Sequence, residues 1–111
     1  MALTVCTALR VLCVATDPDA LAELKRAAVS AEWELAQGAT DEEEALRQLR
    51  EEHAHVAVVF GAFEGFVRRA LVSVPTLRVV SDRPLAGASA VVASLDEVRS
   101  AVLGVPSAGG A

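Results

Sequence analysis

The sequence at Leu9–Leu24 reads LRVLCVATDPDALAEL, and its pattern indicates the fold class more clearly than any other part of the chain. It opens with a nearly continuous apolar run, which is typical of a strand buried on both faces of a parallel sheet. The run ends in a polar turn where Asp17 can cap a helix and Pro18 takes the first helical position. Leu21 and Leu24 then recur at helical spacing. The stretch therefore predicts a strand, Leu9–Ala15, that leads directly into an amphipathic helix with a buried stripe ending near Ala31.

The same alternation of apolar runs and helical patterns continues along the chain, as in a series of βαβ units. Capping-box patterns that begin at Thr40 and Ser94 predict two further helices, and an apolar stripe from Phe66 to Val74 predicts another, which Pro75 stops. Right-handed crossovers place helices on both faces of the sheet. We expect a three-layer α/β/α domain with a five-stranded parallel sheet, whose later strands are Trp33–Ala36, His55–Phe60, Leu77–Val80 and Ala88–Ala93.

The bulk properties indicate one small, acidic domain. The chain has 111 residues, which suits a single domain; we place it at residues 1–106, followed by a flexible tail at 107–111. No apolar run approaches the ~20 residues of a membrane helix, and the start lacks the basic residues of a signal peptide. We therefore expect a cytoplasmic protein without membrane association. A net charge of −5 argues against binding to nucleic acid.

The cysteines are expected to be reduced and structural. If Cys6 and Cys13 both lie on or near the first strand, about 23 Å of extended chain separates them. A disulfide needs Cα atoms within about 7 Å, so these two cannot pair. We interpret both as small buried side chains.

A parallel α/β sheet carries its functional crevice at the carboxyl ends of its strands. Several residues at or near this edge are candidates for a functional role. His53 and His55 have no third metal ligand, and Asp17 with Asp82 would hold a cation only weakly. No Gly-x-Ser-x-Gly elbow and no phosphate-binding glycine pattern is present. We therefore predict no catalytic residue, no metal and no cofactor.

This order of elements resembles the receiver domain of two-component response regulators, from about Leu9 to Val105. The resemblance is carried by VLCVATDPDALAEL at Val11–Leu24, by the strand TLRVVS at Thr76–Ser81 that ends in a hydroxyl residue, and by GASAVV at Gly87–Val92. It implies a flavodoxin-like fold and a role in signalling. The richness in Ala, Val and Arg further suggests a bacterial source.

The positions that receivers use for phosphotransfer are substituted in this chain. The acidic positions that would hold Mg²⁺ fall on Ala15 and Thr16, with Asp17 next. The phospho-acceptor falls on Phe60, or on Gly61 in a register shifted by one. The lysine position falls on Ser94, and only the hydroxyl position, Ser81, matches. The resemblance therefore implies a degenerate receiver that acts as a phosphorylation-independent interaction module rather than an enzyme.

Only Asp82–Gly87 separates the last two expected strands, which is too short for the helix that receivers place there. The fourth helix is thus missing or truncated, and we expect this to uncover an apolar edge. The candidate interface residues, for a homodimer or a protein partner, are Leu85, Val91, Val92, Val98 and Val102. The alternatives are that the loop and the third helix cover this edge, or that the crevice serves as a small-ligand or metal-binding switch.

Overall fold

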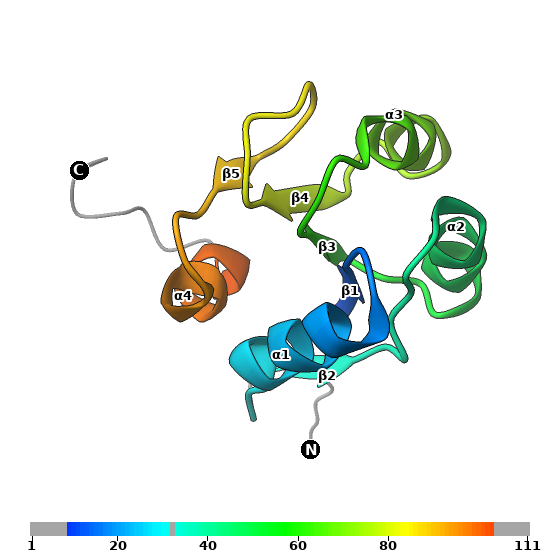
Figure 1. The fold of residues 1–111 in the computed structure, drawn as a ribbon. Coiled ribbons are helices and arrows are strands. Elements are labelled where there is room, and N and C mark those ends of the chain that lie inside the picture. The colour runs from blue at the N-terminus through cyan, green and yellow to red at the C-terminus, as the bar shows by residue number, and fades with distance from the viewer. Residues whose placement is uncertain (1–8, 32, 104–111) are drawn as a thin grey trace, which may run out of the picture.

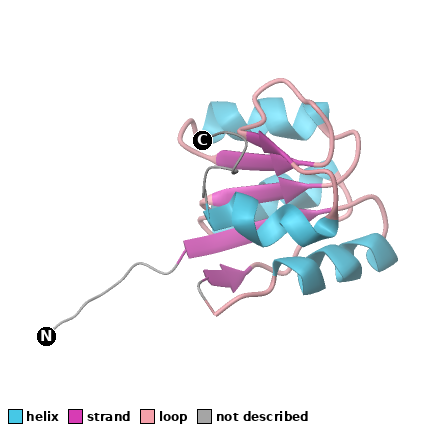
Figure 2. Ribbon diagram, turned by 90° about the vertical axis from the view of Figure 1, so that its left-hand side faces the viewer, coloured by secondary structure: helices cyan, strands magenta, loops and turns pink. Residues whose placement is uncertain are grey.

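The structure, a computed structural model, describes residues 9–31 and 33–103. Its strands form one parallel sheet in the order β2-β1-β3-β4-β5, which places β1 and β3 at the centre. Figure 2 shows the strands pointing in a common direction. The bounds are β1 (Leu9–Val14), β2 (Trp33–Leu35), β3 (Val56–Val59), β4 (Arg78–Ser81) and β5 (Ala90–Val91). The predicted five-stranded parallel sheet is confirmed.

Helices cover both faces of the sheet. Within the described residues they are α1 (Pro18–Ala28), α2 (Glu42–Glu51), α3 (Glu64–Ser73) and α4 (Val98–Leu103), with a 3-10 turn η1 (Leu95–Glu97) before the last. Figure 1 shows α1 and α4 on one face and α2 and α3 on the other. The three-layer α/β/α architecture is therefore confirmed. None of these helices is long and apolar enough to cross a membrane.

The alternation of side chains along β1 builds two cores. Val11 and Cys13 pack with residues of α1 and α4, whereas Leu12 and Val14 pack with residues of α2 and α3. Both sets are fully buried, which is why this strand reads as a continuous apolar run. Burial raises the pKa of the Cys13 thiol to about 12, so the thiol stays protonated at neutral pH. Cys6 lies outside the described residues.

The turn between β1 and α1 forms as predicted. The Ala20 N–H donates to the Asp17 carboxylate at 2.8 Å, and Pro18 occupies the first helical position. The helix ends at Ala28, whose carbonyl accepts a hydrogen bond from the buried Trp33 indole at 2.8 Å. The prediction that Ala31 continues the buried stripe is wrong, because it lies beyond this end and is exposed.

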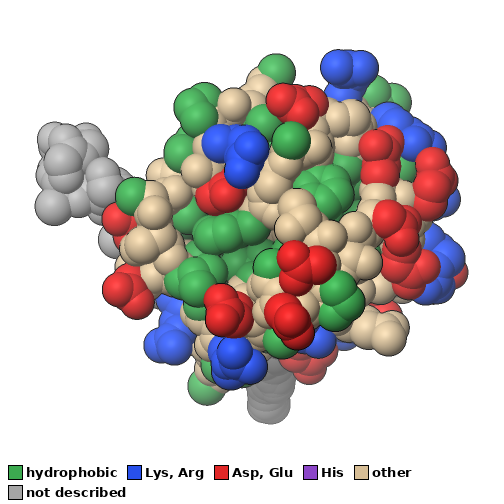
Figure 3. All heavy atoms as spheres, viewed as in Figure 1, with side chains coloured by type: hydrophobic (Ala, Val, Ile, Leu, Met, Phe, Trp, Pro, Cys, Tyr) green, Lys and Arg blue, Asp and Glu red, His purple; other side chains and the backbone are tan. Residues whose placement is uncertain are grey.

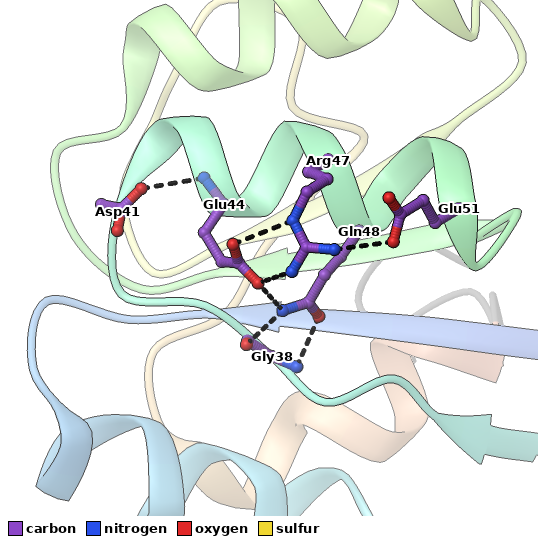
Figure 4. A network of polar contacts seen from close by, with 6 residues as sticks. All are labelled: Gly38, Asp41, Glu44, Arg47, Gln48 and Glu51. Atoms are coloured by element: carbon purple, nitrogen blue, oxygen red, sulfur yellow. Dashed lines mark hydrogen bonds and ion pairs between the residues drawn. The ribbon is translucent and has the colours of Figure 1, made fainter.

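The start of α2 differs from the predicted capping box. Asp41, not Thr40, is the N-cap, and its carboxylate accepts from the Glu44 N–H at 2.8 Å. The loop between β2 and α2 is held by the buried Gln48 side chain. Its amide donates to the Gly38 carbonyl and accepts from the Gly38 N–H, both at 2.8 Å (Figure 4).

The connection between β4 and β5 contains no helix, as predicted. The fifth strand is shorter than the predicted Ala88–Ala93, although Ser89 and Val92 still donate backbone hydrogen bonds to β4. The loop turns at Gly87, which has φ +91°; a Cβ there would lie 2.5 Å from the Leu71 side chain of α3. The loop therefore packs closely on α3. Val105, where the predicted resemblance ends, and the predicted tail 107–111 lie outside the described residues.

Candidate functional site

The ends of the central strands bring the predicted site residues to one edge of the sheet. Val14, Val59 and Ser81 are register partners at the ends of β1, β3 and β4. The residues that follow these strands therefore meet at what we call the carboxyl edge, the face seen in Figures 1 and 3. The predicted pocket residues that lie in strand ends or loops of this edge are Ala15, Thr16, Asp17, Phe60, Gly61, Ser81 and Ser94.

The three residues after β1 provide no carboxylate for a metal in the two positions that the resemblance assigns to Mg²⁺. Ala15 is fully buried, and its N–H donates to the Ala39 carbonyl at 3.1 Å. Thr16 is exposed, and its hydroxyl lies 3.5 Å from the Asp17 carboxylate. Asp17 is committed to capping α1. This segment therefore serves as a structural turn.

The residues that follow β3 stand at the position that the resemblance assigns to the phospho-acceptor, and their side chains contain no oxygen atom. Phe60 is half-buried and packs against the core on the α1 and α4 side. Gly61 has φ +133°, and a Cβ there would lie 2.7 Å from the Thr16 methyl carbon and 2.9 Å from the Phe63 ring. The ends of β1 and β3 thus approach too closely for any side chain at position 61. Neither Phe60 nor Gly61 carries a carboxylate.

The polar residues at the end of β4 and after it hydrogen-bond to one another and to the loop after β3. The Ser81 side chain is fully buried, and its hydroxyl accepts from the Arg83 N–H at 3.2 Å. The Asp82 carboxylate accepts from the Gly61 N–H and from the Arg83 guanidinium, both at 3.2 Å. The hydrogen bond to Asp82 raises the pKa of Arg83. The charge of Asp82 is therefore neutralised by Arg83, and its carboxylate holds the loop after β3 through the Gly61 N–H.

Ser94, at the lysine position of the resemblance, is exposed and begins η1. Its side chain makes no capping hydrogen bond, so the predicted capping box does not form. The Glu97 carboxylate instead accepts from the Ala93 N–H at 2.9 Å. In the part of the chain that the structure describes, no three His, Cys, Asp or Glu side chains come together to hold a metal ion.

The structure opens a groove at a different place from the predicted crevice. It has a volume of about 400 Å³ and lies between α1 and α2, over the loop that follows β2. Leu21 and Lys25 line one wall, and Glu44 and Gln48 line the other. None of the seven predicted pocket residues lines it. No sequence pattern predicts this groove, because it depends on the spacing of two helices and not on a motif.

Most of the predicted interface residues are buried in the domain's own core. Val92, Val98 and Val102 pack between the sheet and α1, and Leu85 packs on the other face with α3. The expectation that they line an uncovered edge is therefore wrong for these four. Val91 alone among the five is exposed, at 52%.

Two residues that matter at this edge were missed as functional elements. Arg83 is not among the predicted site residues, although it pairs with Asp82, whose carboxylate accepts from the Gly61 N–H. Phe63 was not singled out, although its ring packs against the Gly61 backbone. An adjacent Asp-Arg pair directly after a strand is a signal that could have pointed to the first.

No protein-family model matches the chain, and no curated protein matches its sequence significantly. Solved structures do resemble it. A CheY-like response regulator receiver domain protein of Methanospirillum hungatei JF-1 has a TM-score of 0.64 at 19% identity, over 78% of this chain and 81% of that one. An orphan response regulator of H. pylori has a TM-score of 0.68 at 14% identity, over 86% of this chain and 94% of that one. The chain therefore has the flavodoxin-like α/β fold of CheY-like receiver domains.

Proposed function

We propose that this receiver-like domain acts in cytoplasmic signalling as a phosphorylation-independent protein-interaction module. The observation that carries the proposal is Phe60, which occupies the acceptor position after β3 with a half-buried hydrocarbon ring. A phenylalanine has no atom that can accept a phosphoryl group, and the next residue is a glycine packed against Thr16.

The remaining parts of a phosphotransfer site also have no counterpart. Phosphotransfer needs a metal ion and a cation to offset the charge that develops on the transferring group. The positions for the metal ligands hold Ala15 and Thr16, and the position for the lysine holds Ser94. The cation beside the site, Arg83, is already paired with Asp82. These substitutions support a docking role rather than an enzymatic one.

The partner in this proposal is a protein or a second copy of the chain. The net charge of −5 disfavours nucleic acid and anionic lipid surfaces. For self-association the candidate surface is the outer edge of β5. Its exposed Val91 lies on a strand that is hydrogen-bonded along one side only, to β4. An unpaired edge strand with an exposed apolar side chain favours pairing with another chain.

Incubation with acetyl phosphate and Mg²⁺ tests the proposal. We expect the intact mass of the chain to remain unchanged, whereas a phosphorylatable receiver in the same reaction gains one phosphoryl group. A mass gain would contradict the proposal. The variants Asp17→Asn and Asp82→Asn would then identify the acceptor, because these are the carboxylates in the loops that follow β1 and β4.

A further inference from the structure

The carboxyl edge carries apolar side chains at its centre and carboxylates around them. Figure 3 shows hydrophobic side chains gathered in the middle of this face, with acidic side chains toward its rim. Partly buried apolar residues in the loop after β3 and at the start of η1 include Phe60, Phe63 and Leu95, and Ala62 is exposed next to Phe63 in the chain. We call these four residues the apolar patch. Apolar side chains gathered at the surface of a soluble domain favour an interaction there.

The charge around the patch follows from how the helices begin. All five aspartates of the sequence lie in loops after strands or in first helical turns: Asp17, Asp19, Asp41, Asp82 and Asp96. Glu64 and Glu97 belong to the same end of the molecule. Each helix that follows a strand places its N-terminus at this edge, and acidic residues are favoured there by the helix dipole. The result is one strongly acidic end.

Several of these carboxylates are free to meet a partner. Asp19, Glu64 and Asp96 are exposed and make no hydrogen bond or ion pair with the described residues. In the loops that follow the described strands, Arg83 is the one cation, and it is paired with Asp82. The rim is therefore predominantly negative, although Arg83 also interacts electrostatically with Glu64. A surface of this kind repels phosphate-bearing polymers and attracts cationic ones.

We propose that the carboxyl edge docks a basic protein segment that inserts an apolar anchor among Phe60, Ala62, Phe63 and Leu95 while its Lys and Arg residues face Asp19, Glu64 and Asp96. This rests on the proposed interaction function and names the surface and the chemistry of the partner. The apolar centre supplies affinity by desolvation, and the acidic rim supplies orientation and association rate. The face that binds phosphate in a signalling receiver thus becomes a binding face for cationic peptide.

A labelled peptide, acetyl-KRKALFAKRK-amide, serves as the probe. We expect saturable binding to the full chain, with amide shifts in NMR spectra concentrated at Ala62, Phe63 and Leu95. Binding should weaken when NaCl is raised from about 50 to about 500 mM, because exposed charge pairs are screened. A second peptide with Ser-Ser in place of Leu-Phe should bind at least about tenfold more weakly if the apolar anchor contributes.

Paired variants separate this surface from general attraction to an acidic protein. Glu64→Lys/Asp96→Lys reverses the rim, and Glu23→Lys/Glu51→Lys makes the same change in net charge on residues outside it. We expect the rim variant to raise the Kd of the probe at least about tenfold and the control to change it about twofold or less. The milder variant Glu64→Gln/Asp96→Asn replaces the first if thermal unfolding shows that the reversal disturbs folding.

Equal weakening by both variants, equal binding of the Ser-Ser peptide, or no binding would overturn this docking surface. So would concentration-dependent self-association that the rim variant abolishes, since the occupant would then be a second copy of the chain. None of these results bears on phosphorylation. The mass measurement with acetyl phosphate addresses the proposed function separately, and its failure would leave the peptide result standing.

Discussion

At the scale of single residues, Gln48 shows how a polar side chain can organise a turn from inside the fold. It is 3% exposed, and its amide satisfies both backbone groups of Gly38 as well as contacting the Glu44 carboxylate at 2.9 Å. Glu44 is in turn paired with Arg47, which lowers the pKa of that carboxyl group. Figure 4 shows this network linking α2 to the loop that precedes it. Buried backbone groups without partners are costly, so the side chain substitutes for water there.

We predict that Gln48→Leu lowers the free energy of unfolding by about 2–4 kcal/mol, because it leaves the Gly38 N–H and carbonyl buried without partners. Urea unfolding of this variant is compared with that of Gln37→Leu, whose exposed side chain makes no hydrogen bond within the described residues. The control should stay within about 0.5 kcal/mol of the unchanged chain. Equal stability of the two variants would show that Gln48 does not hold this loop.

The sequence predicted the caps only in part, and the reason is local. Asp17 has Pro18 directly after it, so the position of that cap is unambiguous and was predicted correctly. At α2 the pattern Thr40-Asp41 offers two neighbouring cap residues, and a pattern alone cannot choose between them. The structure chooses Asp41 because Ala39 is held by backbone hydrogen bonds to β1, which fixes the register of the following turn.

At the scale of elements, the short helix α4 is held in place by two arginines, one from β4 and one of its own. The Arg78 guanidinium, at the start of β4, donates to the carbonyls of Ala101 and Val102, both at 2.8 Å. Arg99 donates to the Ala27 carbonyl in α1 at 3.1 Å. Cations are favoured at the C-terminal end of a helix, where carbonyls lack intrahelical partners. A helix this short is marginal alone and depends on such contacts.

Arg78→Met keeps the aliphatic stem and removes the guanidinium, so we expect it to destabilise the domain by about 1–3 kcal/mol. The loss should be concentrated in α4, where amide hydrogen exchange should accelerate more than in α2 or α3. Arg68→Met, at an exposed position of α3, is the matched control and should change neither quantity appreciably. Uniform acceleration of exchange across all helices would refute the idea of a local clamp.

Elements with strong periodicity were predicted well, and the weakest element was not. The strands β1, β3 and β4 agree with their predicted bounds to within a residue or so at each end. The fifth strand was predicted from its apolar residues, yet only Ala90 and Val91 pair as a strand. The residues before this strand instead form the turn at Gly87 and bury Leu85 against α3. That choice is made by tertiary packing, which apolar content does not reveal.

At the scale of the whole molecule, the missing helix between β4 and β5 has a smaller effect than the sequence implied. The loop before β5 buries Leu85, so what remains uncovered is Val91 and the outer edge of a two-residue strand. Charge is distributed unevenly, since all five aspartates lie at the carboxyl edge. The fold thus offers two distinct surfaces, an apolar strand edge and an acidic face.

If the β5 edge mediates self-association, Val91→Lys should convert a dimer into a monomer without loss of stability, because the side chain is exposed. Val72→Lys is the matched control, since Val72 is 79% exposed but lies on α3. Sedimentation at high micromolar concentration measures both. A monomeric unchanged chain at that concentration, or dissociation by both variants alike, would count against a dimer through β5.

We propose that the carboxyl edge does not bind a phosphoryl group. Thermal unfolding with beryllium fluoride and millimolar Mg²⁺ tests this proposal. This phosphoryl mimic would reveal any surviving acceptor, whichever residue supplies it. A ligand at about 100 times its Kd adds about 2.7 kcal/mol of stability, which is a rise in Tm of several degrees for a domain of this size. We predict no change in Tm, as expected for Phe60 at the acceptor position. A clear rise would contradict the account and restore phosphorylation as the signal.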